Sequence, residues 1–321
     1  MHCFSHWSFQ PIIPPREPTL SCHDVTVIIP TINFDSPELR ETIRTISLTE
    51  PREILLVTVE ANRQSLADLA RSTQAPNLRI FTVAHANKRH QLCRAIPEVT
   101  TAITVLADDD VAWPPNMLHW LLAPFERPNM GGVGTCQRLH RPDQPNVWNF
   151  LGALYLERRN FEISATTHID GGISCLSGRT AAYRSRILQD QAFMAGFTNE
   201  YWWSKYQLNA DDDNFITRWL VAHGWAIHIQ YSKEAELRTT LEGNPKYLKQ
   251  CLRWSRSNWR SNLKSMLWEK HIWRSVLVVS FRLVFVRYAY QTLGHGKTLV
   301  CMGVELANVL ATSTQCFRSA T

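Results

Sequence analysis

Ala102-Ile-Thr-Val-Leu-Ala107 runs directly into Asp108-Asp109-Asp110, and this junction decides the expected fold. A short, β-branched apolar run is typical of a buried strand. Three adjacent carboxylates repel one another, so a folded chain tolerates them best where a cation lies among them. Asp108 and Asp110 are two residues apart and can point the same way from an extended strand end. We predict Mg²⁺ or Mn²⁺ at this point, with a solvated acidic turn as the alternative.

The residues before this junction alternate between strand-like apolar runs and segments with helical spacing. The expected strands are 25–30, 54–59, 78–83 and 102–107, and the expected helices are 36–49, 65–72 and 88–96. This order predicts an α/β fold with a mainly parallel sheet and helices on both faces. Such sheets bind ligands at the carboxyl ends of their strands, where Pro30, Thr31 and Glu60 also fall.

The composition fits a globular protein with one uneven charge distribution. The chain has 321 residues, of which 45% are hydrophobic and 19% charged, which excludes global disorder. The formal net charge is +6, yet Lys246 to Arg274 alone contains eight basic residues and one acid. The basic character therefore belongs to one segment, and it favours an anionic partner such as phosphate or a lipid surface.

The cysteine spacing and the expected lack of targeting and spanning segments narrow the class of protein further. The eight cysteines include no C-x-x-C pair, which favours reduced thiols over a disulfide scaffold or a zinc site. No signal peptide is expected, and no window reaches the roughly 18 uninterrupted apolar residues of a spanning helix. We expect an irregular leader over 1–23, an α/β domain over 24–245 that carries the candidate site, and an amphipathic helical region over 246–321.

A second acidic cluster, Asp211-Asp212-Asp213, precedes apolar residues with helical spacing. These carboxylates are therefore expected at a helix N-terminus. Ordinary capping and compensation of the helix dipole would explain them without any function. The presence of two such clusters in a chain with an otherwise low charge fraction favours a functional role for this one.

A third pattern is a helix with one basic and one apolar stripe, the latter bearing a tryptophan. The basic stripe is Lys249, Arg253, Arg256, Arg260 and Lys264, and the apolar stripe is Leu248, Leu252, Trp259, Leu263 and Leu267. This pattern suits a helix on a membrane surface, or one that presents arginine to a pyrophosphate. A solvated charged face is the simpler alternative.

Seven motifs occur in an order that resembles processive family-2 glycosyltransferases. They are Val-Ile-Ile-Pro30, Glu60, Asn87-Lys88-Arg89, Asp108-x-Asp110, Ser177-Gly178, Asp212-Asp213 and Gln250-x-x-Arg253-Trp254. Over about residues 24–262 the chain looks most like hyaluronan synthases, and less like chitin and cellulose synthases. The resemblance implies a GT-A fold, an inverting and metal-dependent transfer of a sugar from a UDP donor, and polysaccharide synthesis.

The resemblance also implies a role for each motif. The donor would be bound by Pro30, Thr31, Glu60, Lys88, Arg89, Asp108, Gln250, Arg253 and Trp254. Asp110 would hold the metal, and Ser177, Gly178 and Trp254 would line the acceptor site. Asp213 would be the general base, with Asp212 beside it. The implied partners are a UDP-sugar, a glycan acceptor and an anionic membrane surface on the cytoplasmic side, and no nucleic acid.

Two departures from the family pattern leave other functions open. Many relatives have Asp where this chain has Glu60, and processive synthases carry spanning helices that are not evident here. A peripheral enzyme, or part of a membrane synthase, would fit. A catalytically silent GT-A-like interaction module is one alternative. The other is a sugar-nucleotide pyrophosphorylase, which would need a Gly-rich basic loop after the first strand, and residues 31–36 lack one.

Overall fold

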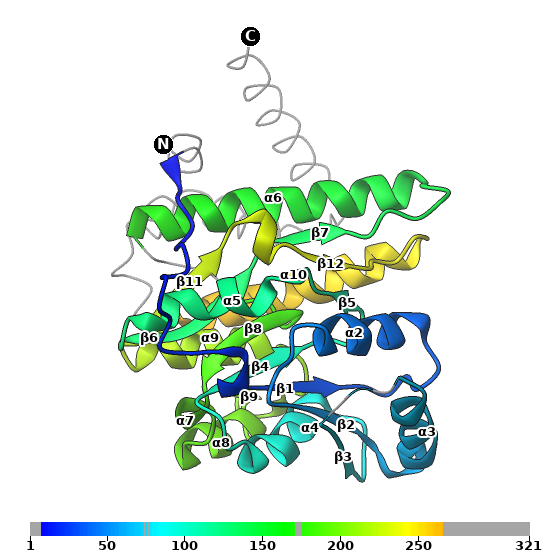
Figure 1. Ribbon diagram of the computed structural model, residues 1–321. Coiled ribbons are helices and arrows are strands. Elements are labelled where there is room, and N and C mark those ends of the chain that lie inside the picture. The colour runs from blue at the N-terminus through cyan, green and yellow to red at the C-terminus, as the bar shows by residue number, and fades with distance from the viewer. Residues whose placement is uncertain (1–7, 74, 76, 171–174, 266–321) are drawn as a thin grey trace.

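The fold is built on a seven-stranded sheet (Figure 1). The computed structural model describes residues 8–73, 75, 77–170 and 175–265. In spatial order the strands are β11 (Ala226–Gln230), β6 (Met130–Thr135), β8 (Thr180–Arg184), β4 (Ile103–Ala107), β1 (Val25–Pro30), β2 (Glu53–Val59) and β3 (Leu78–Val83). Only β8 runs antiparallel to its neighbours in this sheet. The predicted mainly parallel α/β fold is confirmed.

The predicted helices of the first half are also confirmed, with shifted ends. They are α2 (Pro37–Ser47), α3 (Arg63–Thr73) and α4 (Lys88–Ala95). The Ser36 side chain caps α2 by accepting from the Leu39 amide, and Asn87 caps α4 in the same way. Helix α3 begins earlier than expected because a 3₁₀ turn at Glu60–Asn62 leads straight into it.

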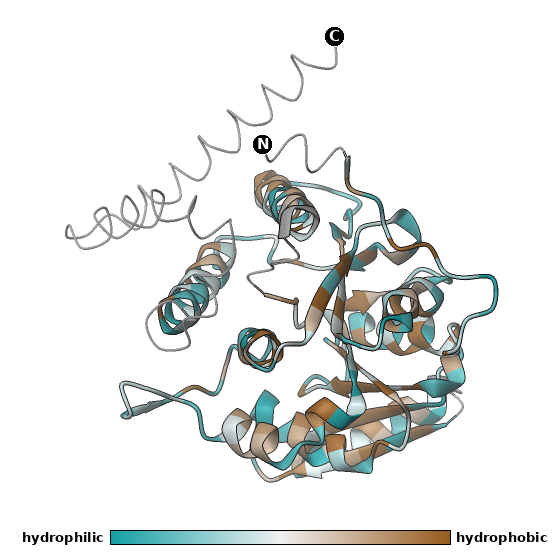
Figure 2. Cartoon of the chain, turned by 90° about the vertical axis from the view of Figure 1, so that its left-hand side faces the viewer, coloured by the Kyte–Doolittle hydropathy of each residue, from teal (hydrophilic) through white to brown (hydrophobic). Residues whose placement is uncertain are grey.

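Apolar residues fill both faces of the sheet. Alternate residues of β1 point to opposite sides, so Val27 belongs to one core cluster and Ile28 to the other. Helices α2 and α3 cover the first cluster, and α4 covers the second together with α8 (Gln191–Thr198) and α9 (Asp212–Ala222). Figure 2 shows apolar residues concentrated on the sheet and the inward helix faces. This two-sided burial explains why the strands read as continuous apolar runs.

After residue 110, besides β6, β8, β11 and α8, the chain contains further elements that the sequence patterns did not predict. They are α5 (Met117–Leu122), α6 (Val147–Asp170), α7 (Ser185–Leu188), the hairpin β9 (Tyr201–Trp202) and β10 (Tyr206–Gln207), and a small sheet ordered β5 (Val111–Ala112), β12 (Leu237–Thr239) and β7 (Gln137–Leu139). The basic helix expected after residue 245 is α10 (Lys246–Lys264). In Figure 1, α6 and α10 lie on the same side of the sheet.

The described part of the expected leader runs beside β11. The rings of Phe9 and His228 stack with their centroids 6.0 Å apart. The side-chain amide of Gln230 accepts from the Ile12 backbone N–H and donates to the Ile12 carbonyl. Among the described residues, no helix has the length and apolarity needed to cross a bilayer. The apolar region expected after Lys264 as an interfacial segment lies outside the described residues beyond 265.

Candidate active site at the carboxyl ends of the strands

Lys88 joins the two acidic clusters that the sequence places far apart. Its Nζ lies 2.7 Å from Asp108 Oδ1, at the end of β4, and 3.0 Å from Asp212 Oδ2, in the first turn of α9. Burial alone would lower the pKa of the Lys88 ammonium, but the charges of Asp108, Asp212 and Asp213 raise it above its usual value. A permanently charged lysine therefore holds carboxylates from two distant segments at one point.

Asp213 lies against the glycine of the Ser177-Gly178 motif. The Gly178 amide donates to Asp213 Oδ2 at 3.1 Å, and the Asn214 amide donates to Oδ1 at 2.8 Å. Burial and the neighbouring Asp212 raise the pKa of Asp213 above its usual value, against the lowering effect of Lys88. A Cβ at position 178 would lie 3.0 Å from Lys88 Nζ, so this close approach favours glycine.

The other two carboxylates of the first cluster have separate partners. Thr31 donates to Asp109 Oδ2 at 2.5 Å, and Thr240 donates to Asp110 Oδ2 at 3.2 Å. Burial, and then repulsion from Asp108, raise the pKa of Asp110 to about 6. Arg179 lowers this pKa in part, so Asp110 is a desolvated carboxylate whose negative charge is only partly compensated, and a bound cation would relieve that condition.

The carboxylates described above can be compared with the ligands that the expected metal site needs. The described residues contain no group of three or more His, Cys, Asp or Glu side chains that could hold an ion together. Magnesium, however, is commonly held by one or two carboxylates and completed by substrate phosphates and water. The hard oxygen of Asp110 fits a site of that kind.

The Arg89 side chain is not positioned for the expected contact with the nucleotide-sugar donor. Its side chain is 1% exposed, and it donates to Glu200 at 2.9 Å. It also donates to the backbone carbonyls of Phe197, Ala210 and Asp211 at 3.0, 2.8 and 3.1 Å. Because its guanidinium is buried among protein acceptors, the structure contradicts a direct donor contact for Arg89. Its role is to hold the loop that leads into Asp212.

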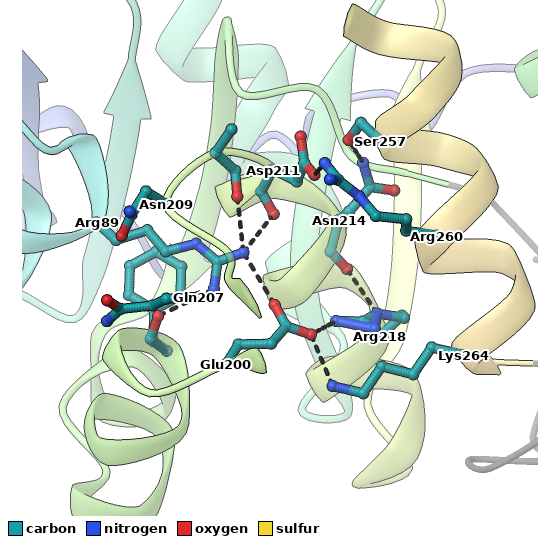
Figure 3. A network of polar contacts seen from close by, with 12 residues as sticks. Arg89, Glu200, Gln207, Asn209, Asp211, Asn214, Arg218, Ser257, Arg260 and Lys264 are labelled. Atoms are coloured by element: carbon teal, nitrogen blue, oxygen red, sulfur yellow. Dashed lines mark hydrogen bonds and ion pairs between the residues drawn. The ribbon is translucent and has the colours of Figure 1, made fainter. Parts of the chain in front are cut away.

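Glu200 is the centre of the buried network that contains Arg89 (Figure 3). Its carboxylate, 2% exposed, also pairs with Arg218 of α9, and with Lys264 of α10 at 2.7 Å. Burial would raise the pKa of Glu200, but Arg218, Arg89 and Lys264 outweigh that effect and lower it. One carboxylate therefore connects the loop before β9 with both helices.

Asp211 gives α10 a second anchor in this network (Figure 3). Arg260 donates to Asp211 Oδ2 at 2.9 Å, and Asp211 has a left-handed backbone with φ of 68°. The basic stripe predicted for α10 is therefore wrong in part, because Arg260 and Lys264 face α9 and its loop. Asp211 and Glu200 neutralise them there, although the two basic side chains stay 34% and 31% exposed.

The Gln-x-x-Arg-Trp motif occupies the first half of α10. Gln250 Oε1 accepts from the Glu242 amide at 3.4 Å, and Arg253 is exposed. The Trp254 ring stacks on Tyr155 of α6 with centroids 5.0 Å apart, and the Arg179 guanidinium lies 5.3 Å from the Trp254 centroid. Trp254 is thereby linked to the residue that directly follows Ser177-Gly178.

The remaining donor residues lie at the ends of β1 and β2. Pro30 ends β1, and the carbonyl of Thr31 accepts from the Gln91 amide at 3.1 Å. Glu60 follows β2, is exposed, and lies 3.6 Å from Arg63. All three are at the predicted edge of the sheet, and their contacts with a donor stay predictions.

Sequence reasoning missed several residues of this region. Glu200, Tyr155 and Arg179 carry no spacing signal, because each meets its partners only through the tertiary fold. Arg179 was the one that could have been found, since a basic residue directly follows the Ser177-Gly178 motif.

Comparison with known proteins identifies relatives of this chain. The family described as "Glycosyltransferase like family 2" matches residues 23–257. A type 2 glycosyltransferase of Zymoseptoria tritici is 58% identical over 88% of this chain and 59% of its own length. An NDP-glycosyltransferase of Aspergillus luteorubrus is 34% identical over 81% of this chain and 65% of its own. The chain thus spans less than two thirds of these curated relatives.

More distant comparisons agree with the fold. Human hyaluronan synthase 3 is 26% identical over 70% of this chain and 41% of its own length, so the processive subtype stays a prediction. A mannosyltransferase from Pyrobaculum calidifontis, solved in complex with GDP-Man and Mn²⁺, superposes with a TM-score of 0.60 at 16% identity. That superposition covers 98% of this chain and 89% of the other, and it supports the expected GT-A architecture.

Proposed function

The chain belongs to glycosyltransferase family 2, and we propose that it transfers a sugar from a nucleoside-diphosphate donor to a hydroxyl group of a glycan or other acceptor. UDP is the nucleotide that we propose, with inversion at the transferred carbon and with Mg²⁺ or Mn²⁺. The observation that carries the proposal is the meeting of Asp108, Asp212, Asp213 and Gly178 around Lys88. The NDP-glycosyltransferase relative supports the donor class.

The geometry supports a single displacement with Asp213 as the base. An acceptor hydroxyl beside Gly178 gives its proton to Asp213, and its oxygen attacks the anomeric carbon. The bond from that carbon to the diphosphate oxygen breaks on the opposite face, and the diphosphate leaves with the electron pair. A raised pKa makes Asp213 a stronger proton acceptor, and the two backbone amides hold its carboxylate in place.

The departing diphosphate needs positive charge nearby. A divalent ion held by Asp110 would neutralise charge on the diphosphate. Among the residues of the chain, Lys88 beside Asp108 and the exposed Arg253 of α10 are the cations proposed to face it.

The proposal is tested by following donor hydrolysis and transfer over a panel of UDP-sugars, with GDP-mannose included. Turnover of one nucleotide sugar would support it. Calorimetry with UDP, with and without Mn²⁺, addresses the alternative of a silent interaction module. No binding under either condition, together with no turnover, would favour that module.

Asp110→Asn is expected to abolish the Mn²⁺-dependent part of UDP affinity while leaving the fold intact, because the ion would lose its charged protein ligand. In the unchanged protein, metal-dependent affinity should weaken as the pH falls through about 6, since protonated Asp110 cannot bind a cation. Calorimetry across this pH range measures both effects. Asp68→Asn, on the exposed side of α3, is the control. Unchanged Mn²⁺ dependence in Asp110→Asn would remove this residue from the metal site.

We also propose that α10 and the region after it associate with an anionic membrane surface on the cytoplasmic side. Lys249, Arg253 and Arg256 are exposed on α10, and Leu252 beside them is 41% exposed. Basic residues near an anionic leaflet contribute about 1 kcal/mol each, and apolar burial adds to this. Arg253 is partly excluded from that sum because it is also proposed to face the diphosphate.

Flotation with liposomes tests the membrane proposal. The protein is expected to float with anionic vesicles, less with neutral ones, and less again at high salt, because salt screens only the electrostatic part. Lys249→Gln combined with Arg256→Gln should weaken flotation at low salt. A protein that stays at the bottom of every gradient would contradict membrane association.

A further inference from the structure

We propose that Arg159 and Arg179 form an oxyanion-binding subsite beside Trp254 and the Ser177-Gly178 motif. The ligand chemistry is a phosphate or carboxylate group, which either the donor diphosphate or an acidic acceptor could supply. This inference deepens the proposed function, because the subsite adjoins the residues around Asp213.

Arg179 is held in position without a carboxylate partner. Its Nη1 donates to the neutral Gln137 amide oxygen at 2.9 Å, and its guanidinium lies 5.3 Å from the Trp254 ring centroid. Within the part of the chain that the structure describes, Arg179 forms no direct ion pair, and its charge acts on Asp110 only at longer range, where it lowers the pKa of that carboxylate. The chain directly before it contacts Asp213 through the Gly178 amide. A half-buried cation with this support is oriented, and because Asp110 offsets its charge only in part and without a hydrogen bond, its remaining N–H groups can bind a ligand.

Arg159 contributes a second guanidinium from α6. It follows Tyr155 by four residues, so both side chains lie on one face of the helix, and Tyr155 stacks on Trp254 at 5.0 Å. The Nη1 atom of Arg159 is buried and has no hydrogen-bond acceptor among the described residues. The Nε2 of Gln137, whose Oε1 supports Arg179, is also buried without an acceptor. A buried hydrogen-bond donor without an acceptor raises the free energy of the folded protein. A bound oxyanion would accept from these groups and remove that penalty.

Two neighbouring cations also repel each other, which favours an anion between them. Burial lowers the pKa of the Arg159 guanidinium, and the charge of Arg179 adds to this, against the raising effects of Cys175, Tyr155 and Asp213. Arginine stays protonated throughout. Guanidinium groups bind phosphate and carboxylate in a bidentate manner. The adjacent Trp254 ring offers an apolar face to the C–H side of a sugar. An anionic sugar bound here would place its neighbouring hydroxyl groups near Asp213.

Calorimetry on the full chain with three probes tests the subsite. The probes are inorganic phosphate alone, UDP with Mn²⁺, and glucuronate or neutral glucose added to protein saturated with UDP and Mn²⁺. Arg179→Gln and Arg159→Gln should each weaken phosphate binding at least about tenfold, as expected for a charged hydrogen-bonded partner. Arg186→Gln is the matched control, since Arg186 is exposed on α7 and lies over Trp225.

The second and third probes identify the source of the oxyanion. A parallel loss of UDP affinity assigns the subsite to the donor diphosphate. Loss of a preference for glucuronate over glucose, with UDP affinity unchanged, assigns it to an acidic acceptor. Phosphate binding that is weak in the unchanged protein, or equal in all variants, would overturn the subsite. Arg179→Lys, which keeps the charge but loses the planar fork, replaces Arg179→Gln if that variant does not fold. Phosphate binding in a protein that fails to bind UDP would contradict the proposed function alone.

Discussion

Asp213→Asn is expected to lower the rate of sugar transfer by at least about 100-fold, with donor affinity nearly unchanged. The amide can still accept from the Gly178 backbone, so the geometry survives, but it cannot take a proton from the acceptor hydroxyl. Because the pKa of Asp213 is raised above that of an ordinary aspartate, the rate should increase with pH through that raised value. Initial rates and UDP affinities across pH measure all of these effects.

In Asp213→Asn, the fall of the transfer rate at low pH should disappear. Asp143→Asn, at an exposed position in the loop before α6, is the matched control and should keep both the rate and the profile. If Asp213→Asn retains its transfer rate, the base lies elsewhere. Asp212, whose carboxylate lies 3.0 Å from Lys88, is then the first candidate.

Glu200→Gln is expected to lower the free energy of unfolding by about 3–5 kcal/mol, the usual cost of breaking a buried ion pair from one side. The change leaves Arg89, Arg218 and Lys264 without their shared counter-charge. Urea unfolding of the variant and the unchanged protein gives the difference. Glu157→Gln, at a half-exposed carboxylate 3.8 Å from Arg138, should change stability by no more than about 0.5 kcal/mol.

Acidification provides an independent check on Glu200. Its pKa is lower in the folded chain than its ordinary value of 4.5, so the folded state favours the charged form. The stabilisation is therefore complete above the unfolded pKa and is lost as the pH falls through the lower folded value. The difference between Glu200→Gln and the unchanged protein should shrink below about pH 4.5. Equal stability of the two proteins at neutral pH would show that the carboxylate does not hold this network together.

The first half of the fold could be predicted because its signals are local. Strand β1 is buried on both faces and reads as an unbroken β-branched run, and Ser36 and Asn87 mark where α2 and α4 begin. The second half could not be predicted in the same way. The strand β8 inserts between β4 and β6 in the opposite direction, and no residue pattern within 180–184 indicates its neighbours.

The sequence by itself determined the fold class, the edge of the sheet at which the candidate site lies, and the identity of the two acidic clusters. These properties depend on the types and local spacing of residues. Only the tertiary structure decided which charges compensate which. Lys88 and Arg89 are adjacent and equally basic in the sequence, yet one faces the carboxylates of the candidate site and the other is buried against Glu200. Charge pairing acts through space, and at a few ångströms its strength depends on burial, so the partner of each group follows from the fold.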